Sequence, residues 1–345
     1  MNGIVGLANL GNTCFMNSIL QIFSHTPELN NALLNNKIVV LDTDTPIKQV
    51  DKRLSLKWIE LYQALWSSSH NDINLKAFHQ AFQQNVKLKN KNNTFLGFRQ
   101  NDSSELLAIL MDSLHGSISR EVSMTIRSTA STTTDNVAIQ CYEMFKLIYT
   151  KDYSEILHVF FGITVSNIVS QSTGKTLGVT PQPFFEINLH IPVKTLKENN
   201  FSLTQCLDAY CDAETLDDYT NELTKEKESV KRTIRFWSFP PILVISLKRY
   251  NNCNIKNNSL VVFPFQINMR PYLYESAILL PLMYELYGVC QHHGNANGGH
   301  YTACVKHATF KEWYMFNDAQ VSKINESQIQ QIVSANAYCL FYRKI

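Results

Sequence analysis

The chain lacks several features that would assign it to a specialised class of protein. Its eight cysteines are scattered over 345 residues without a C-x-x-C pair, so no disulfide framework is indicated. Its longest apolar stretch, residues 277–289, is interrupted by Pro281 and Glu285 and is too short to span a bilayer. Its first residues, MNGIVGLANLGN, contain no basic segment or apolar core and therefore no secretory signal. We expect an intracellular chain with reduced cysteines, in the cytoplasm, the nucleus or both.

An excess of charge of either sign is also missing. The 31 basic and 29 acidic residues leave a formal net charge of +2. This balance favours neither nucleic acid nor an anionic membrane as a partner. The length predicts about two domains or one large domain, and the composition, 45% hydrophobic and 17% charged, is that of an ordinary globular protein.

What the chain does contain is a cysteine at the expected start of a helix. Cys14 lies in GLANLGNTCFMNSILQ, where Asn12 and Thr13 are candidate N-cap residues. Unpaired N–H groups and the helix dipole favour a thiolate in a first helical turn, and with an imidazolium nearby they can lower a thiol pKa from about 8.5 by several units. The alternative is a buried cysteine without chemistry, which describes most free cysteines. Apolar residues then follow at helical spacing: Phe15, Ile19, Ile22 and Phe23.

A histidine and an Asn-Asp pair lie near the other end of the chain. His300 follows two glycines, and Asn317 and Asp318 come shortly after it. A thiol, an imidazole that activates it and a group that orients the imidazole are the parts of a cysteine hydrolase. Taken alone, His300 would be an ordinary histidine of a sheet, and the Asn-Asp pair would indicate a turn.

Helical patterns dominate the first 115 residues. The clearest helix is expected at 102–114, where Asp102 and Glu105 form a start that resembles a capping box. Gly116 is expected to end this helix. The Ser/Thr-rich residues 117–136 are expected to form a loop.

Strand patterns dominate from residue 156. Residues 156–169 are rich in Ile, Val and Phe, and 242–247 form the near-continuous apolar run ILVISL, which is typical of a strand covered on both faces. The glycine- and asparagine-rich residues 292–299 are expected to form a loop. Helices followed by strands predict an α+β fold with an antiparallel sheet.

Several blocks together resemble the ubiquitin-specific protease family of deubiquitinases. GLANLGNTCFMNSILQ is similar to the family's Cys box, and YELYGVCQHHGNANGGHYTACVK with WYMFNDAQVSKI to its His box. RQNDSSELLAILMDSLH and FPPILVISLKRY match further blocks in family order. The resemblance implies a single catalytic domain over 1–345, a papain-like cysteine protease of thumb, palm and fingers around a central antiparallel sheet. The thumb would cover approximately 1–155, the fingers 158–235 and the palm 236–345.

The resemblance also implies a role for each residue of the catalytic set. Cys14 would be the nucleophile, and His300 would activate the thiol and later protonate the leaving amine. Asn317 would orient the imidazole, with Asp318 as its rival for this role. Asn9 would donate a hydrogen bond to the oxyanion, and the loss of such a donor typically costs about 10²–10³ in rate.

Further positions would contact the C-terminal tail of ubiquitin. Helix capping alone explains Asp102, and a hairpin connection alone explains the glycines, but both functions can coexist with contact to the tail. The residues implied as substrate-binding are Gln100, Asp102, Glu105, Gly298, Gly299 and Tyr301.

The sequence departs from many family members at the fingers. Two C-x-x-C pairs that would bind a structural zinc are absent, and Cys206 and Cys211 cannot supply four ligands. We therefore expect no metal and no cofactor, with the fingers held together by strand pairing alone.

The resulting hypothesis is a deubiquitinase, a cysteine-type hydrolase that cleaves after the C-terminal glycine of ubiquitin through a thioester. Its partners would be ubiquitin and ubiquitinated proteins, without nucleic acid or membrane, and it would be a monomer. Three alternatives remain. They are specificity for a ubiquitin-like modifier, a papain-like endopeptidase (whose C-G-x-C-W surroundings are absent) and a non-catalytic ubiquitin-binding scaffold.

Overall fold

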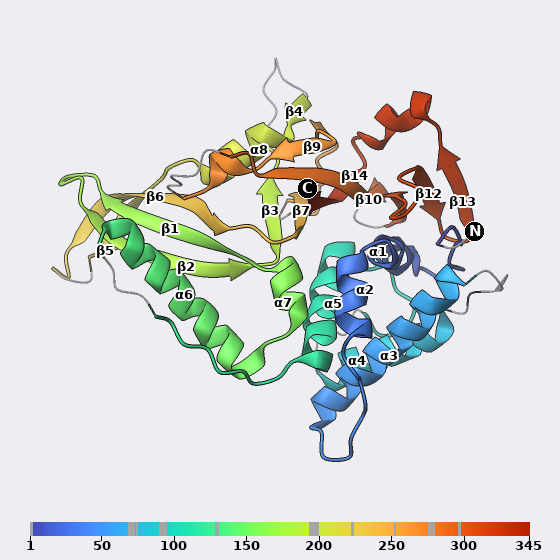
Figure 1. Ribbon diagram of the computed structural model, residues 1–345. Helices are drawn as coiled ribbons and strands as arrows, with labels where there is room; N and C mark the ends of the chain where they lie inside the picture. The colour runs from blue at the N-terminus through green and yellow to red at the C-terminus, as the bar shows by residue number, and fades with distance from the viewer. Residues whose placement is uncertain are drawn as a thin grey trace.

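The computed structural model consists of a helical half and two main sheets (Figure 1). The strands pair mostly in antiparallel fashion, which confirms the predicted α+β class. No helix among the described residues is long and apolar enough to cross a membrane. The residues that the structure describes are 3–67, 73, 75–89, 95–127, 131–192, 200–221, 224–251, 253–274, 280–295 and 298–345.

The helical half surrounds α1, in which every residue is buried. Helices α3 and α4 pack together, and α3 also packs against α5, while α1 contacts strands of the large sheet. Cys14, the first residue of α1, therefore lies at the junction between the helices and the sheet. The helices are α1 (Cys14–Ser24), α2 (Pro27–Leu34), α3 (Pro46–Trp66), α4 (Lys76–Leu88), α5 (Ser103–Ile118), α6 (Thr133–Asp152) and α7 (Glu155–Phe160).

Helix α5 begins as predicted but continues beyond its predicted end. Asp102 is the N-cap, and its Oδ1 accepts hydrogen bonds from the backbone N–H groups of Ser104 (2.7 Å) and Glu105 (3.2 Å). The helix then passes through Gly116 and ends at Ile118. A Cβ at Gly116 would lie 2.6 Å from Oδ2 of Asp51 on α3. This glycine therefore permits close helix packing and does not end the helix.

The larger sheet has the strand order β13-β12-β11-β10-β14-β7-β3, with β9 paired to β10. Ile242–Leu247 in β7 is buried throughout, as its apolar run predicted. We call this sheet the palm sheet. Its strands are β3 (Glu186–His190), β7 (Ile242–Lys248), β9 (Gln266–Asn268), β10 (Met283–Asn295), β11 (Gly298–Lys306), β12 (Trp313–Asn317), β13 (Gln320–Ile324) and β14 (Ala337–Lys344).

The segment predicted as a loop at 292–299 instead extends two strands of the palm sheet. His293 pairs with His300, Gly294 with Gly299, and Asn295 with Gly298. Gly294 has φ of 115°, and a Cβ there would lie 2.7 Å from Cα of Gly299. The glycines that suggested a loop thus allow two strands to approach closely near the end of a hairpin. Residues 296 and 297 lie outside the described residues.

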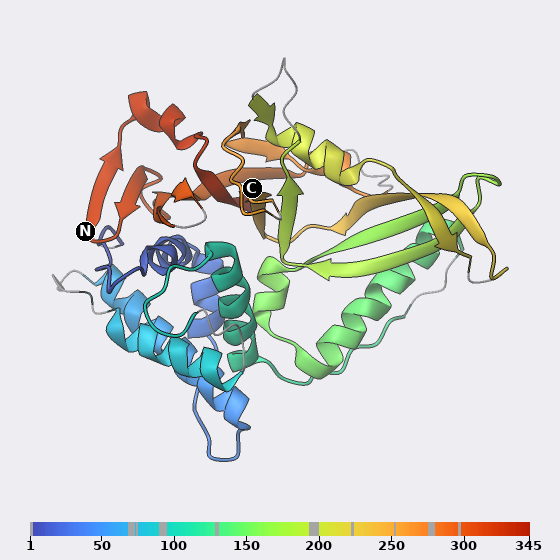
Figure 2. The ribbon, with the colours of Figure 1, turned by 180° about the vertical axis from the view of Figure 1, so that it is seen from behind.

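A second sheet of order β2-β1-β6-β5 projects from the palm sheet, and we call it the finger sheet. Figures 1 and 2 show α6 lying along it, and Val137 and Cys141 of α6 form a small core with Ile163 and Val165 of β1. The prediction that strand pairing alone holds the fingers together is therefore wrong. The strands of the finger sheet are β1 (Gly162–Ser170), β2 (Thr176–Phe184), β5 (Glu214–Thr220) and β6 (Lys227–Ser238).

Two further boundaries differ from the prediction. Residues 155–160 form α7, so only the second half of the predicted strand 156–169 is extended. A short apolar run fits a buried helix as well as a buried strand, which explains the error. The predicted loop 117–136 is shortened by α5 at one end and by α6 at the other, where Thr132 and Asp135 form a capping box.

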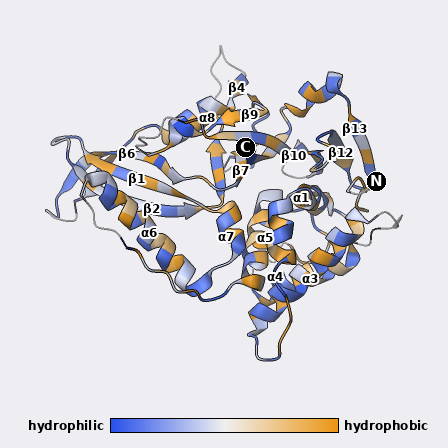
Figure 3. Cartoon of the chain, in the orientation of Figure 1, coloured by the Kyte–Doolittle hydropathy of each residue, from blue (hydrophilic) through white to orange (hydrophobic). Residues whose placement is uncertain are grey.

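The palm sheet separates two hydrophobic cores. One core joins α1, α3, α4 and α5 to one face of the sheet, and the other covers the opposite face together with α8. Figure 3 shows hydrophobic residues in these layers and hydrophilic residues at the far end of β5 and β6. The remaining elements are β4 (Asn200–Ser202), α8 (Leu203–Cys211), β8 (Leu260–Val262) and the 3-10 helices η2 (Arg270–Tyr272) and η3 (Glu326–Ile332).

Candidate active site

Cys14 occupies the predicted position but not the predicted electrostatic state. Thr13 is the N-cap of α1, although its side chain accepts from the N–H of Leu10 (3.0 Å) and not from the helix. Burial raises the pKa of the Cys14 thiol above its ordinary value. The backbone N–H of Tyr301 opposes this shift, and the negative charge of Asp318 adds to it. The prediction of a lowered pKa is therefore wrong for the free protein.

His300 and Asn317 meet across adjacent strands of the palm sheet. His300 lies in β11 and Asn317 ends β12, and His300 Nε2 is 2.6 Å from Asn317 Oδ1. Asp318 Oδ2 is 3.9 Å from the same nitrogen, so Asn317 is the hydrogen-bonding partner. Because Nε2 is engaged, Nδ1 is the ring nitrogen left for a thiol proton. Among the described residues, no hydrogen bond joins His300 to Cys14.

Asp318 connects the segment around Cys14 to the palm sheet. Its Oδ2 accepts from Asn9 Nδ2 (2.9 Å), and its Oδ1 accepts from Asn17 Nδ2 (2.7 Å). Its backbone carbonyl accepts from the N–H of Leu7 (2.9 Å). Its φ of 50° lies in the left-handed region, which asparagine and aspartate tolerate better than most residues. Asp318 thus fixes the segment before Cys14 against the end of β12.

Hydrogen bonds at both the oxygen and the nitrogen of its side-chain amide fix the orientation of Asn9. Its Oδ1 accepts from the backbone N–H groups of Gly11 (2.9 Å) and Thr13 (3.0 Å), and one N–H of its amide donates to Asp318. The second N–H has no hydrogen-bond partner among the described residues. An oxyanion donor would use this second N–H.

Gln100 forms a reciprocal pair of hydrogen bonds with the peptide of Gly299. Gln100 Nε2 donates to the Gly299 carbonyl (3.2 Å), and the Gly299 N–H donates to Gln100 Oε1 (3.1 Å). A Cβ at Gly299 would overlap Nε2 of His292 and lie 2.6 Å from the carbonyl oxygen of His293. A Cβ at Gly298 would lie 3.6 Å from Gln100 Oε1. Both glycines of the motif therefore lie against the segment that precedes α5.

A cavity of about 350 Å³ brings together most of the residues implied as substrate-binding. The hydroxyl of Tyr338 donates to Asp102 Oδ2 at its wall, while Asp102 Oδ1 caps α5. The cavity is lined by Gln100, Asn101, Asp102, Glu105, Tyr250, Asn254, His292, Asn295, Tyr301 and Tyr338.

Sequence reasoning missed two residues at this site. Asn17 is 2% exposed in α1 and binds Asp318, and a polar residue among the apolar positions after Cys14 was its only signal. Tyr338 comes from β14, more than 200 residues from Asp102, and nothing local in the sequence indicates their contact.

No group of three or more His, Cys, Asp or Glu side chains able to hold a metal ion occurs in the described part of the chain. Cys206 and Cys211 lie buried in α8, within the second hydrophobic core. The expectation of no metal and no cofactor stays a prediction.

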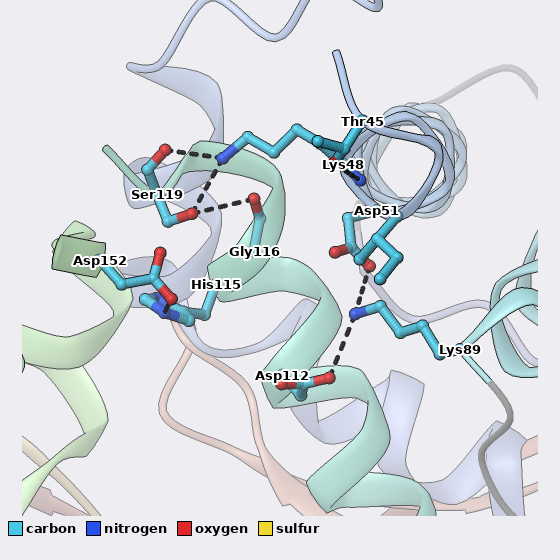
Figure 4. Close-up of a pocket in the computed structure, with 10 residues that line it drawn as sticks. Thr45, Lys48, Asp51, Lys89, Asp112, His115, Gly116, Ser119 and Asp152 are labelled. Atoms are coloured by element: carbon cyan, nitrogen blue, oxygen red, sulfur yellow. Dashed lines mark hydrogen bonds and ion pairs between the residues drawn. The ribbon is translucent and has the colours of Figure 1, made fainter. Parts of the chain in front are cut away.

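A cavity of about 360 Å³ on the helical half is rich in charged groups that pair with each other (Figure 4). Lys89 bridges the carboxylates of Asp51 (2.6 Å) and Asp112 (3.1 Å). Lys48 donates to the backbone carbonyl of Ser119 (2.6 Å). This pairing ties α3 to the ends of α4 and α5, so the groups have a structural role.

Comparison with solved structures defines the class of the fold. The chain is similar to the SAGA DUB module of Ubp8, Sgf11, Sus1 and Sgf73 bound to monoubiquitin, with a TM-score of 0.75 and 24% identity, over 100% of this chain and 70% of that one. A yeast SAGA module in another structure gives a TM-score of 0.72 at 23% identity. The fold is that of a papain-like cysteine protease with thumb, palm and fingers, as predicted. The boundaries between these parts stay a prediction.

Comparison with protein families is more specific. Residues 5–342 match the model of the ubiquitin carboxyl-terminal hydrolase family. The chain belongs to this family, and the resemblance found in the sequence is confirmed.

Individual relatives agree with this assignment. Ubiquitin carboxyl-terminal hydrolase 2 of Bos taurus is 30% identical over 99% of this chain and 55% of its own length. The Gallus gallus protein of the same name is 32% identical over 99% of this chain and 94% of its own length. The chain thus spans about half the length of the first of these relatives.

Proposed function

We propose that this protein hydrolyses isopeptide or peptide bonds after the C-terminal glycine of ubiquitin, through a thioester with Cys14. The observation that carries the proposal is the 2.6 Å contact between His300 Nε2 and Asn317 Oδ1, on the strands beside the start of α1. It leaves Nδ1 as the base for a thiol, which is the arrangement that nucleophilic catalysis by cysteine requires. Family membership supports the same reaction.

In the proposed reaction, His300 Nδ1 takes the proton of the Cys14 thiol, and Sγ attacks the carbonyl carbon of the terminal glycine. The resulting oxyanion accepts a hydrogen bond from the second N–H of Asn9. His300 then protonates the leaving amine, and the C–N bond breaks to give the thioester. A water molecule, deprotonated by His300, hydrolyses the thioester and restores the thiol. Asn317 keeps the imidazole in the tautomer and orientation that these proton transfers need.

The substrate groove in this proposal is the cavity beside Asp102. Asp102 and Glu105 supply carboxylates for a basic tail, and Tyr301 supplies a wall. The hydrogen bonds between Gln100 and Gly299 leave little space beside the catalytic histidine, which favours a tail that ends in glycines. Ubiquitin would be the modifier and ubiquitinated proteins the partners. A monomeric state and an intracellular location remain predictions of the sequence.

Binding of the tail would also complete the catalytic pair. In the free protein the Cys14 thiol is buried and makes no hydrogen bond to His300 within the described residues. Catalytic hydrogen bonds often tighten only in the substrate complex. We propose that the bound tail brings Sγ and Nδ1 into contact.

Trapping with modifiers that carry a C-terminal electrophile tests this proposal. Wild type should form a covalent adduct with a ubiquitin probe and none with SUMO-like or Nedd8-like probes. Cys14→Ala should abolish the adduct. Cys253→Ala is the matched control, because Cys253 is an exposed cysteine outside the proposed catalytic set, and this variant should react as wild type does.

Three outcomes would contradict the proposal. An adduct on Cys253 would contradict the role of Cys14 as the nucleophile. An adduct with another modifier alone would favour a ubiquitin-like substrate. Binding of ubiquitin by folded wild type without any adduct would favour the scaffold alternative.

A further inference from the structure

A β-bulge near the start of β14 places Tyr338 beside the cavity that contains Asp102. Cys339 pairs with Cys290 of β10, but the next pair in the register joins Ala337 to Gln291. Tyr338 is therefore an extra residue in β14 with no partner of its own in β10. A bulge of this kind disrupts the pairing locally and turns a side chain in a new direction.

The bulge changes the face of the palm sheet on which Tyr338 lies. Along β14, Leu340 and Tyr342 belong to the core that contains α8, whereas Cys339 and Phe341 belong to the core that contains α5. Strict alternation along a strand would place residue 338 in the core of α8. Tyr338 instead lies in the core of α5. The bulge thus brings this side chain to the helical half of the molecule.

Tyr338 contacts both walls of the cavity. Its hydroxyl donates to Oδ2 of Asp102, at the start of α5. Its ring centroid lies 6.1 Å from that of Tyr301 in β11, with an interplanar angle of 77°, and 6.1 Å from that of His292 in β10. All four residues line the cavity of about 350 Å³. Tyr338 therefore joins the start of α5 to the hairpin of β10 and β11.

The two oxygens of the Asp102 carboxylate have different partners. Oδ1 caps α5 by accepting from the N–H groups of Ser104 (2.7 Å) and Glu105 (3.2 Å), and Oδ2 accepts from Tyr338. Burial, together with the negative charge of Asp102, raises the pKa of the Tyr338 hydroxyl, so this group stays a donor. A carboxylate oxygen can accept more than one hydrogen bond. Oδ2 therefore keeps an acceptor position for a ligand while its orientation is fixed.

We infer that Tyr338 is a positioning residue, whose hydroxyl holds the Asp102 carboxylate in the orientation that receives the basic tail of the modifier. The inference rests on the proposed function, in which Asp102 contacts that tail. Tyr338 acts through Asp102 and takes no part in the steps that make or break bonds. Its hydroxyl should therefore contribute to the binding of ubiquitin and not to kcat.

The dissociation constant of ubiquitin tests this inference without hydrolysis. It is measured by calorimetric titration of the full chain carrying Cys14→Ala, which serves as the parent. Tyr338→Phe, added to this parent, keeps the ring and its contacts and removes only the hydroxyl. We expect the dissociation constant to rise about tenfold, because a hydrogen bond to a charged group is lost.

Tyr342→Phe is the matched control. Tyr342 lies in the same strand, and its hydroxyl donates to the Pro264 carbonyl (2.7 Å). This variant also loses a hydrogen bond of a buried tyrosine, but Tyr342 lies in the other core and does not line the cavity. Its dissociation constant for ubiquitin should equal that of the parent.

A double-mutant cycle tests whether Tyr338 acts through Asp102. Asp102→Asn keeps an oxygen that can cap α5 but replaces the other oxygen with an amide nitrogen, which cannot accept from Tyr338. In the Asp102→Asn background, Tyr338→Phe should change the dissociation constant by less than about twofold, because the interaction is already lost. A further tenfold rise in this background would overturn the inference.

Kinetics with Cys14 intact supply a second readout. Tyr338→Phe should raise KM about tenfold and leave kcat within about twofold of wild type. A loss in kcat with unchanged KM would overturn the inference.

Three binding results would also overturn the inference. They are an unchanged dissociation constant in Tyr338→Phe, a lower one, which would show that the hydroxyl competes with the tail, and an equal rise in Tyr342→Phe. Failure of the proposed function is distinguishable. Binding results as expected, without turnover by wild type, would contradict the proposed reaction and support the role of Tyr338. Absence of ubiquitin binding by the parent would contradict both.

Discussion

The candidate active site around Cys14 and the finger sheet are held together in different ways. At the candidate site, side chains join residues that are far apart in the chain, since Asp318 binds Asn9 and Asn17 across about 300 residues. The finger sheet is built from antiparallel pairing and from a small core of four fully buried residues shared with α6. Hydrogen bonds between side chains thus connect distant segments at the candidate site, whereas backbone pairing connects the strands of the finger sheet.

The end of the finger sheet illustrates this contrast. The turn after β1 and the turn between β5 and β6 are joined through Glu228, which accepts hydrogen bonds from Ser170 Oγ (2.5 Å) and Asn221 Nδ2 (2.7 Å). The two C-x-x-C pairs that many family members carry in the fingers are absent from this sequence. Here polar side chains connect the two turns.

The largest effect is expected from a methyl group added to the hairpin of β10 and β11, which carries His300. Gly299→Ala would place a Cβ against His292 Nε2 and shift the strand that carries His300. A displacement of about 1 Å can cost about 10²-fold in rate, and we expect a loss of kcat/KM on that scale. Gly178→Ala is the matched control, because a Cβ at this position of β2 meets nothing within 4 Å. An equal kcat/KM for the two variants would contradict the expected difference between the two regions.

An intermediate effect is expected in the pH dependence of Cys14 alkylation by iodoacetamide. Burial raises the pKa of this thiol, and the thiolate is the reactive form. Below that pKa the thiolate fraction falls about tenfold for each pH unit, so the rate should fall steadily as the pH is lowered from 8 to 6. The rate is followed on the Cys14 peptide by mass spectrometry, separately from Cys253. A plateau over this pH range would show a thiolate–imidazolium pair already formed in the free protein.

The smallest effect is expected at the end of the finger sheet. Hydrogen bonds from Ser170 and Asn221 lower the pKa of Glu228, so the ionised form stabilises the folded turns at neutral pH and this contribution is lost on acidification. Glu228→Gln should therefore speed amide hydrogen exchange in the two turns at neutral pH, while α1 and the palm sheet keep their protection. Faster exchange throughout the molecule would instead show that the two regions unfold together.

The fold could be predicted from the sequence where one local pattern dominates. The nearly continuous apolar run of β7 and the Asp102 cap of α5 are both found as expected. Errors arose where one pattern fits two structures. The start of the apolar segment predicted as a strand forms α7. The glycines that suggested a loop also permit the close strand contact of Gly294 with Gly299.

For the candidate site, the sequence supplied the residue types but not the contacts between distant segments. Nothing local predicts that Tyr338 donates to Asp102 or that Gln100 binds the peptide of Gly299. The pKa of Cys14 could not be predicted either, because the dipole of α1 is visible in the sequence whereas burial between α1 and the palm sheet is a tertiary effect. The choice between Asn317 and Asp318 as the histidine's partner likewise required distances.

The most direct test is the rate at which a fluorophore is released from the C-terminus of ubiquitin, measured for wild type, Cys14→Ala, Asn317→Ala and Asp318→Asn. We expect turnover by wild type and none by Cys14→Ala. For Asn317→Ala we expect a loss of about 10²-fold or more in kcat, because the imidazole loses its orientation. Asp318→Asn keeps an acceptor for Asn9 and should lose less. Full activity in Asn317→Ala together with a large loss in Asp318→Asn would contradict the assignment of His300 and Asn317 as the catalytic pair beside Cys14.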